Sequence, residues 1–379
     1  MQRRSFLAGA AALASAGRAF AQGVGRGEIV LGQTADFSAS RAAIAKAYAQ
    51  GAALHFDKVN AAGGVNGRRI RVAQLDDAYD TPRALDNARE LVERRQVFAL
   101  VHSVGTGITG RLLPYVDEQG VPHVHPLTGA DQVRPPMHTS AQTFFLRASY
   151  GREVERIVEQ LHTLGIRRIA LVYEDEPFGH GIRDAVQAAM KQRGGTPAAL
   201  GVLPFNQANE AAVAPAVAAV ARGEPAAVIV GSAGPSVEHF IRGYRAAGQG
   251  AQLYCLSVSN VERLHKALDH LSRGIVVAQV MPPVQTSNLP VVRDYRAAVA
   301  ARAEPGGTFG LEGYISAHMI VQALHAAGRE PTRAAFVQAL ASPALTHVGG
   351  FPVRFRSEPR EGSPYVNLAI VGPGGKLVQ

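Results

Sequence analysis

Short apolar runs alternate with longer segments of helical period from Glu28 onward. In the first part of the chain this pattern predicts strands at residues 29–34, 70–75, 99–102, 123–125 and 144–148 and helices at 42–60, 82–94 and 110–118. Strands and helices that alternate in this way form parallel sheets, because a right-handed helical crossover brings each strand back beside its predecessor. We therefore expect an α/β fold with helices on both faces of a doubly wound parallel sheet.

The same order of elements begins again after residue 148, which predicts a second doubly wound lobe of similar size. Its strands are expected at 168–173, 199–203, 227–231, 252–256 and 274–279, and its helices at 151–164, 179–192, 211–222, 237–247 and 261–268. The remainder, with helices at 290–303, 312–327 and 332–340 and strands at 351–355 and 365–372, contains too much helix for a third sheet domain. We expect it to complete the first two lobes.

Several chain crossings between the lobes follow from this arrangement. The first lobe is expected to comprise residues 28–147 plus 280–350, and the second lobe residues 148–279 plus 351–379. Pro282-Pro283 and Gly349-Gly350 would lie near crossings, where a few backbone positions absorb a hinge rotation.

The first 21 residues have the pattern of a secretory signal peptide. Arg3 and Arg4 precede a short apolar run, and Ala19-Phe20-Ala21 ends it in the manner of a cleavage site. The apolar run is too short to span a bilayer, and the paired arginines fit either the general secretory route or the twin-arginine route. We expect residues 1–21 to be removed and the mature chain to reach the periplasm.

Composition narrows the function classes. With 47% hydrophobic and 18% charged residues, the 379-residue chain has a globular composition, and no later stretch reaches the roughly 18 apolar residues of a membrane span. Removal of the signal lowers the formal charge from +9 to +6, and the remaining charges are scattered, which argues against nucleic acid. Cys255 is the single cysteine, so no internal disulfide forms, and we expect a buried side chain.

Residues Gly105-Thr106-Gly107-Ile108-Thr109-Gly110 form a GxGxxG sequence between a predicted strand and a predicted helix. In a dinucleotide fold such glycines bring a pyrophosphate to the helix N-terminus, but here the motif follows the third strand, and the next strand does not end in an acid. Two alternatives are a tight turn and a carboxylate cradle. In the cradle, free backbone N–H groups and the Thr106 hydroxyl bind a carboxylate, because the positive end of the helix dipole attracts any anion.

Thr128-Gly129-Ala130 repeats this arrangement one strand later. Because parallel α/β sheets bind ligands beyond the carboxyl ends of their strands, both loops would face one crevice, although an ordinary strand-to-helix turn is the alternative.

His123 and His125 would lie on one face of a strand, but no acid at metal-ligand spacing accompanies them, so buried or edge histidines are expected and no metal site. The chain has no G-x-S-x-G elbow, and its acidic clusters lack a matched nucleophile. We predict no catalysis and no cofactor.

Several motifs resemble, in order, the binding proteins of branched-chain amino-acid ABC transporters. The first-lobe motifs are Gln50-Gly51-Ala52, Val59-Asn60 through Gly63-Gly64-Val65-Asn66-Gly67 to Ile70, Asp76-Asp77-Ala78-Tyr79-Asp80, Val104-Gly105-Thr106, Gly120-Val121-Pro122 and Thr128-Gly129-Ala130. The later ones are Arg168–Tyr173 with Phe178-Gly179, and Leu311-Glu312-Gly313-Tyr314 with Ala323-Leu324. The similarity covers nearly the whole mature chain.

This resemblance implies the periplasmic type I binding fold, in which hinge closure of two lobes clamps a ligand. It implies that small-residue loops of the first lobe hold the ligand carboxylate, that an aromatic of the second lobe covers it, and that another loop forms the opposite wall. The corresponding residues here are Gly105, Thr106 and Gly107; Thr128, Gly129 and Ala130; Phe178; and Phe37, Ser38 and Ser40.

The departures from the family pattern bear on the ligand. Family members that bind amino acids place an acid after the 252–256 strand to pair with the ligand ammonium, and Ser257 stands here instead. Ser232-Ala233-Gly234 replace an aromatic wall, and a cysteine pair is missing, with Tyr79 at one of its positions. A buried ammonium without a counter-charge is costly. An organic acid, aromatic or not, is therefore favoured over leucine or valine, within a roomier pocket lined also by Ser232, Ala233 and Ser257.

We therefore expect an exported, monomeric substrate-binding protein that captures a small carboxylate (an amino acid or an organic or aromatic acid) and delivers it to the membrane permease of an ABC importer. An exported NAD(P)-dependent oxidoreductase and a ligand-sensing receptor module are the alternatives.

Overall fold

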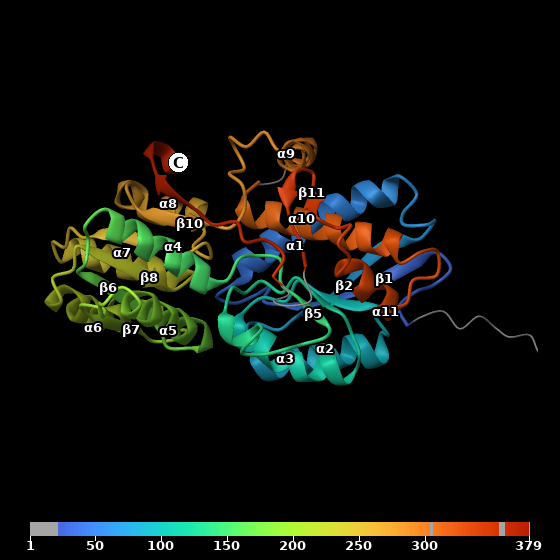
Figure 1. Ribbon diagram of the computed structural model, residues 1–379, viewed down its shortest axis with the longest axis horizontal. Helices are drawn as coiled ribbons and strands as arrows, with labels where there is room; N and C mark the ends of the chain where they lie inside the picture. Colours follow the sequence, from blue (N-terminus) through green and yellow to red (C-terminus); the bar gives the residue numbers. More distant parts are fainter. Residues whose placement is uncertain (1–21, 304–305, 356–360, 379) are drawn as a thin grey trace, which may run out of the picture.

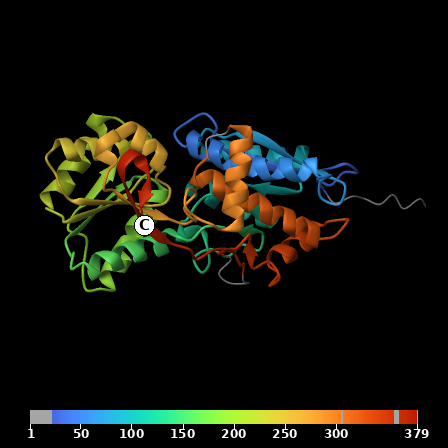
Figure 2. The ribbon, with the colours of Figure 1, turned by 90° about the horizontal axis from the view of Figure 1, so that it is seen from above.

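The chain folds into two bodies that lie side by side along the longest axis of the molecule (Figure 1). The computed structural model describes residues 22–303, 306–355 and 361–378, so the predicted signal peptide lies outside the described residues. Seen from above, the two bodies stay distinct and segments of chain connect them (Figure 2). This arrangement agrees with the predicted two-lobed α/β architecture.

The first lobe contains a five-stranded parallel sheet with the order β2-β1-β3-β4-β5. Its strands are β1 (Glu28–Ala35), β2 (Arg69–Asp76), β3 (Ala99–Val101), β4 (His123–Val124) and β5 (Thr143–Phe144). Strand β1 lies inside the sheet and places Ile29 and Leu31 in one core and Val30 in another, because successive side chains point to opposite faces.

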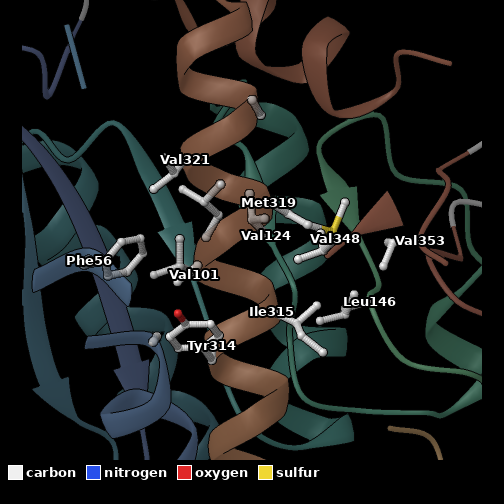
Figure 3. Close-up of a cluster of buried hydrophobic side chains, with 14 of the residues drawn as sticks. Phe56, Val101, Val124, Leu146, Tyr314, Ile315, Met319, Val321, Val348 and Val353 are labelled. Carbon is white, nitrogen blue, oxygen red and sulfur yellow. The ribbon is translucent and has the colours of Figure 1, made fainter. Parts of the chain in front are cut away.

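Helices cover both faces of this sheet. One face is covered by α1 (Ala42–Ala61) and α10 (Thr308–Ala326), and the other by α2 (Thr81–Arg89), its π-helical extension (Glu90–Arg94) and α3 (Thr106–Glu118). Figure 3 shows α10 crossing the sheet, with Tyr314, Ile315 and Met319 packed between strand residues such as Val101 and Val124. The core of the first lobe therefore depends on a helix that arrives late in the sequence.

Helices α1 and α10 approach closely at three glycines. A Cβ atom on Gly51 would lie 1.8 Å from the Gly310 carbonyl oxygen, and one on Gly313 would lie 2.0 Å from the Tyr48 carbonyl oxygen. No side chain fits at these distances, so both helices need glycine there.

The second lobe contains a seven-stranded sheet with the order β14-β13-β10-β9-β8-β6-β7. Its parallel strands are β6 (Ile169–Glu174), β7 (Leu200–Leu203), β8 (Ala227–Gly231), β9 (Gln252–Cys255) and β10 (Val276–Gln279). The C-terminal strands β13 (Asn367–Val371) and β14 (Leu377–Val378) add antiparallel pairs at one edge. The sheet is therefore mixed at that edge and parallel elsewhere.

The helices of the second lobe also cover both faces. Helices α4 (Tyr150–Thr163) and α5 (Pro177–Lys191) share one core, whereas α6 (Glu210–Arg222), α7 (Pro235–Ala246) and α8 (Val261–Leu268) share the other. The buried Cys255 lies in the second of these cores, as expected.

The chain crosses between the sheets three times: between β5 and α4, between β10 and α9 (Pro290–Arg302), and between β12 (Phe351–Pro352) and β13. Helix α11 (Arg333–Leu340) and the ribbon of β11 (His347–Val348) with β12 complete the first lobe. Phe351, Val353 and Phe355 lie in the first lobe's core, and pairing with the second sheet starts at Asn367. We therefore propose that the third crossing lies after Phe355 and not at residue 350.

Element boundaries differ from the predictions at a few places. The helix expected at 110–118 begins at Thr106, because Gly105 adopts φ +113° and ends the preceding loop there. The short strands β11 and β14 were not predicted, since two-residue pairings leave no periodic signal. Among the described residues, no helix combines the length and the apolar character that a membrane crossing requires.

Candidate ligand-binding site

The start of α1 is fixed by a buried carboxylate in the loop after β1. Asp36 accepts hydrogen bonds from the backbone N–H groups of Ser38, Ala39 and Arg41 at 3.0, 2.6 and 2.6 Å. These bonds satisfy donors that a helix N-terminus leaves unpaired. The loop therefore holds Arg41 at the edge of the first lobe that faces the second.

The loop after β2 places Tyr79 in the same cleft. Ala78 and Tyr79 both adopt left-handed backbone conformations, with φ +50° and +59°, which non-glycine residues rarely adopt. Asp77 holds this loop, because it accepts from the Tyr79 N–H at 2.9 Å and from the Thr34 hydroxyl at 2.9 Å. Burial raises the pKa of Asp77 to about 6. Such strained residues cluster at functional sites.

The N-terminus of α3 faces the cleft beneath Tyr79. Its N-cap, Gly105, supplies no side-chain cap, and a Cβ atom there would lie 2.6 Å from the Tyr79 ring. The first-turn N–H groups of a helix have no intrahelical acceptors, and they carry the positive end of the helix dipole. This end of α3 can therefore donate to an anion.

Two threonine hydroxyls meet beside that helix end. The Oγ1 atoms of Thr106 and Thr128 lie 2.9 Å apart, and Thr128 Oγ1 also accepts from the Ala130 N–H at 3.2 Å. Both residues are buried. When Thr128 donates its proton to Thr106, the Thr106 proton is free for a ligand, because Thr106 lines the cleft.

Aromatic side chains from the second lobe face this cradle. Phe178, in the first turn of α5, packs edge-on against Tyr150 at a centroid distance of 5.3 Å. The Tyr150 N–H donates to the Gly129 carbonyl at 2.6 Å, and a Cβ atom on Gly129 would lie 2.5 Å from the Tyr150 ring. Glycine at 129 therefore lets the first turn of α4 approach the first lobe.

The cleft pocket lies between the lobes. The side chains that surround it are mainly apolar or aromatic, with Arg41 and Thr106 as polar members, and they are Arg41, Ile44, Tyr79, Val104, Gly105, Thr106, Leu127, Tyr150, Phe178, Ala233 and Val258. The space among them measures about 300 Å³, counting the part that opens to solvent, and only about 20 Å³ is wide enough for water. Side chains of the two lobes therefore fill most of the space between them.

Arg41 joins the two lobes across this pocket. Its guanidinium donates to Glu174 at 2.7 Å, to Glu176 at 3.2 Å and to the Ala233 carbonyl at 2.9 Å, and it lies 5.1 Å from the Tyr79 ring centroid. Burial opposes the charge of Arg41, but Glu174 and Glu176 outweigh it and raise the guanidinium pKa above its ordinary value. Burial raises the pKa of Glu176 to about 7, although Arg41 opposes this rise.

The structure brings some of the predicted site residues into this pocket. Gly105, Thr106, Phe178 and Ala233 line it directly. Thr128, Gly129 and Ala130 support the cradle from behind, and Gly107 lies in the first turn of α3. Ser40 lines a neighbouring space, described below.

Other predicted residues have different contacts. Phe37 packs in a small cluster with Ile44 and Leu127, and the exposed Ser38 hydroxyl donates to Asp76 at 2.6 Å. The Ser232 hydroxyl donates to Glu174 at 3.2 Å. These hydroxyls organise the loops around the cleft.

Ser257 contacts a carboxylate from another helix. The N–H and hydroxyl groups of Ser257 donate to the two Glu153 oxygens at 2.8 and 2.7 Å. Burial raises the pKa of Glu153 to about 7, and Arg147 opposes this rise. Arg147 itself forms a bidentate buried pair with Glu312. An acid therefore lies beside position 257, but its oxygens are engaged by Ser257.

The two predicted histidines are buried, as expected. His123 Nε2 lies 2.8 Å from the Ser103 hydroxyl, and His125 Nδ1 lies 2.6 Å from the Ser316 hydroxyl. Ser316 also contacts His102 Nε2 at 2.7 Å. Within the described part of the chain, no group of three or more histidine, cysteine or acidic side chains is arranged to hold a metal ion.

A larger groove lies elsewhere on the first lobe, between α1 and β2. Its volume is about 1370 Å³, counting the part that opens to solvent. Only first-lobe residues line it, so closure of the lobes would not enclose a ligand there. The interlobe pocket is the better candidate site.

Sequence reasoning missed Arg41, Tyr79 and Tyr150. Arg41 is one of 39 basic residues, and no pattern distinguishes it. Tyr79 could have been found, because it follows a predicted strand in the Asp76–Asp80 segment that the sequence analysis had singled out.

Known proteins resemble most of this chain in structure and parts of it in sequence. A substrate-binding periplasmic protein from Ralstonia solanacearum is 32% identical, with a TM-score of 0.86 over 93% of this chain and 100% of that one. The Leu/Ile/Val-binding protein of Escherichia coli K12 is 25% identical over 256 residues, 66% of each chain. A branched-chain amino acid ABC transporter structure from Thermus thermophilus with bound valine has a TM-score of 0.83 over 94% of this chain and 96% of that one, and its 16% identity shows the fold alone.

The chain spans about 44% of the length of the curated relatives that it matches first. The model of the periplasmic binding protein family matches residues 28–375. This match confirms the predicted type I fold and the resemblance to Leu/Ile/Val-binding proteins, and it favours a binding protein over the oxidoreductase alternative. The chain therefore belongs to the periplasmic binding protein family.

Proposed function

We propose that this protein is the substrate-binding protein of an ABC importer and that it captures a small carboxylate between its lobes. The observation that carries this proposal is the pocket that joins the α3 N-terminus and the Thr106 hydroxyl on one lobe to Phe178 on the other. Backbone N–H groups and a hydroxyl orient a carboxylate, and the apolar walls supply most of the burial energy. The relative named Leu/Ile/Val-binding protein supports a small carboxylate as the ligand, because leucine, isoleucine and valine are small carboxylates.

The ligand is an organic acid and not a simple α-amino acid. The pocket lining contains one cation, Arg41, and no carboxylate. Glu174 and Glu176 lie behind Arg41 and pair with it, and Glu153 is bound by Ser257. A ligand ammonium would therefore lack a free counter-charge. Burying such an unpaired ion costs on the order of several kcal/mol of desolvation free energy.

Two matched ligand pairs test this proposal by titration calorimetry. Phenylacetate should bind and phenylacetamide should not, because the amide lacks the charge that the α3 N-terminus stabilises. In the second pair, 4-methylpentanoate should bind more tightly than leucine, which differs by the α-ammonium group. Equal binding of acid and amide would contradict the carboxylate cradle, and tighter binding of leucine would contradict the organic-acid assignment.

The cellular context is part of the same proposal. Residues 1–21 direct export, and the mature protein works in the periplasm with a membrane permease as its partner. Deletion of residues 1–21 should abolish export, and replacement of Arg3 and Arg4 by lysine should block it only if the twin-arginine route is used. Cell fractionation measures both outcomes, and export of the deleted protein would contradict this assignment.

A further inference from the structure

A second compartment adjoins the cleft pocket. The space among its side chains measures about 350 Å³, counting the part open to solvent, and only about 10 Å³ of it is wide enough for water. Both lobes contribute to it. Ile44 and Val258 line both spaces. Ser40 and Gly234 of the second compartment are the chain neighbours of Arg41 and Ala233 in the first. The two compartments therefore lie next to each other between the lobes, and Ile44 and Val258 form the wall that they share.

Gly234 lets the loop after β8 approach the first lobe closely. It adopts φ +69°, and a Cβ atom there would lie 2.9 Å from Arg41 Nη1 and 3.1 Å from the Ser40 carbonyl oxygen. The shape of the second compartment therefore depends on a residue without a side chain at position 234.

Two hydroxyls in the second compartment lack a strong hydrogen-bond partner. Ser40 Oγ, from the first lobe, is buried and has no partner in the described structure. Ser259 Oγ, from the second lobe, is also buried, and its neighbour is the Cys255 thiol, which is a weak hydrogen-bonding group. Buried polar groups are nearly always hydrogen-bonded, and unpaired ones call for a ligand or other occupant.

The charges of the compartment already balance. Its charged lining residues are Glu238 and Arg263, and these two side chains form an ion pair with each other. The Asn260 side chain accepts from the Arg263 N–H at 2.8 Å and so caps α8. The remaining wall, which includes Val237 and Leu264, is apolar. A second charged group of the ligand would find no free partner here, whereas a neutral polar group would find two hydroxyls.

We infer that the ligand is an elongated carboxylic acid with a neutral hydrogen-bonding group, such as a hydroxyl, at the end opposite its carboxylate. This inference rests on the proposed function, which places the carboxylate at Thr106. The apolar middle of the ligand passes between Ile44 and Val258, and the distal hydroxyl binds Ser40 and Ser259. Opening of the lobes admits the ligand, and closure brings the two serines onto it from opposite sides.

The test compares acids with and without a distal hydroxyl by titration calorimetry: 3-phenylpropanoate against 3-(4-hydroxyphenyl)propanoate, and hexanoate against 6-hydroxyhexanoate. In the unmodified mature protein, at least one hydroxylated acid should bind about tenfold more tightly than its parent. In S40A and in S259A this preference should fall to about twofold or less, while the affinity for the parent acid stays within about twofold. S342A, a serine change outside the cleft, should keep the full preference.

Three outcomes separate the two proposals. Parent acids that bind in a Thr106-dependent way but gain nothing from the hydroxyl in either pair would overturn this inference and leave the proposed function standing. A preference that survives both serine variants would also overturn it. Failure of all four acids at millimolar concentration would overturn both. Circular dichroism verifies folding, and S40A, which changes a loop residue, carries the test if S259A does not fold.

Discussion

Arg41 of the first lobe donates to Glu174 of the second at 2.7 Å, and both side chains are buried. Because the two residues lie on opposite sides of the cleft, this ion pair exists only when the lobes are closed. Glu176 and the Ala233 carbonyl extend the same contact. Closure therefore exchanges the hydration of one cation and two carboxylates for direct contacts, and the balance between these terms sets how readily the empty protein closes.

Replacing Arg41 by methionine should shift the protein towards the open form. The change leaves Glu174 and Glu176 buried without their cation, and an uncompensated buried charge of this kind costs about 3–5 kcal/mol. Opening lets water reach these carboxylates. Small-angle scattering should therefore show a larger radius of gyration for R41M than for the unmodified protein.

R156M is a suitable control for this experiment, because Arg156 is exposed and, among the described residues, its ion pair is with its helix neighbour Glu159. It should leave the radius of gyration unchanged. An R41M variant as compact as the unmodified protein would show that the ion pair does not hold the lobes together.

Removal of the cradle hydroxyls should weaken binding of a carboxylate ligand. T106A and T128A should each reduce the binding free energy by about 1–3 kcal/mol, the usual scale for a lost hydrogen bond to a charged group. The two effects should not add, because the hydroxyls bond to each other at 2.9 Å. Titration of both single variants and the double variant measures this coupling, and an unchanged affinity in the double variant would mean that the cradle is assigned to the wrong residues.

The buried histidines should make the fold sensitive to acid. Burial lowers the pKa of His102 and of His123 to about 3, whereas an unfolded histidine has a pKa near 6.5. Between these values the unfolded chain binds more protons, so the free energy of unfolding falls as the pH falls, by about 1.4 kcal/mol per pH unit for each histidine.

H123N removes one of these groups. Urea denaturation between pH 6 and pH 4 should show a slope about 1.4 kcal/mol per pH unit shallower in H123N than in the unmodified protein. Parallel slopes in the two proteins would mean that His123 is not buried in its neutral form.

The glycine contact between α1 and α10 should tolerate no side chain. G313A places a methyl group where 2.0 Å separates it from the Tyr48 carbonyl oxygen, and overpacking of this kind costs about 1–3 kcal/mol. Thermal denaturation should show a lower Tm for G313A. G250A is the control, because it changes a glycine with free space around it. G328A would not serve, since Gly328 has φ +90° and any side chain there is strained. A G313A protein as stable as G250A would contradict the close approach of the two helices.

The sequence pattern was sufficient for the α/β order of elements and for much of the first-lobe cradle. Thr106 and Thr128 follow adjacent strands of a parallel sheet, so their meeting could be predicted from strand order alone. The start of α3 was placed four residues late, because a run of glycines reads as a turn until the φ angle of Gly105 is known.

Contacts between residues far apart in the sequence could not be predicted in this way. The Arg41–Glu174 pair joins residues 133 positions apart on the two lobes, and the Ser257–Glu153 contact joins residues 104 positions apart within the second lobe. Neither pair has a local pattern, since the first depends on how the two sheets are oriented and the second on how α4 packs against the end of β9. Tyr79 reaches the cleft only because Ala78 and Tyr79 adopt left-handed conformations that no residue preference indicates.

A crystal structure of the mature protein with a bound carboxylic acid, such as 3-phenylpropanoate, shows whether the α3 N-terminus binds the carboxylate. We expect electron density between the lobes, with carboxylate oxygens at hydrogen-bonding distance from the Thr106 hydroxyl and the first-turn N–H groups of α3, and with the Phe178 ring against the apolar part. An acid bound in the groove between α1 and β2, or with its carboxylate turned away from α3, would contradict it.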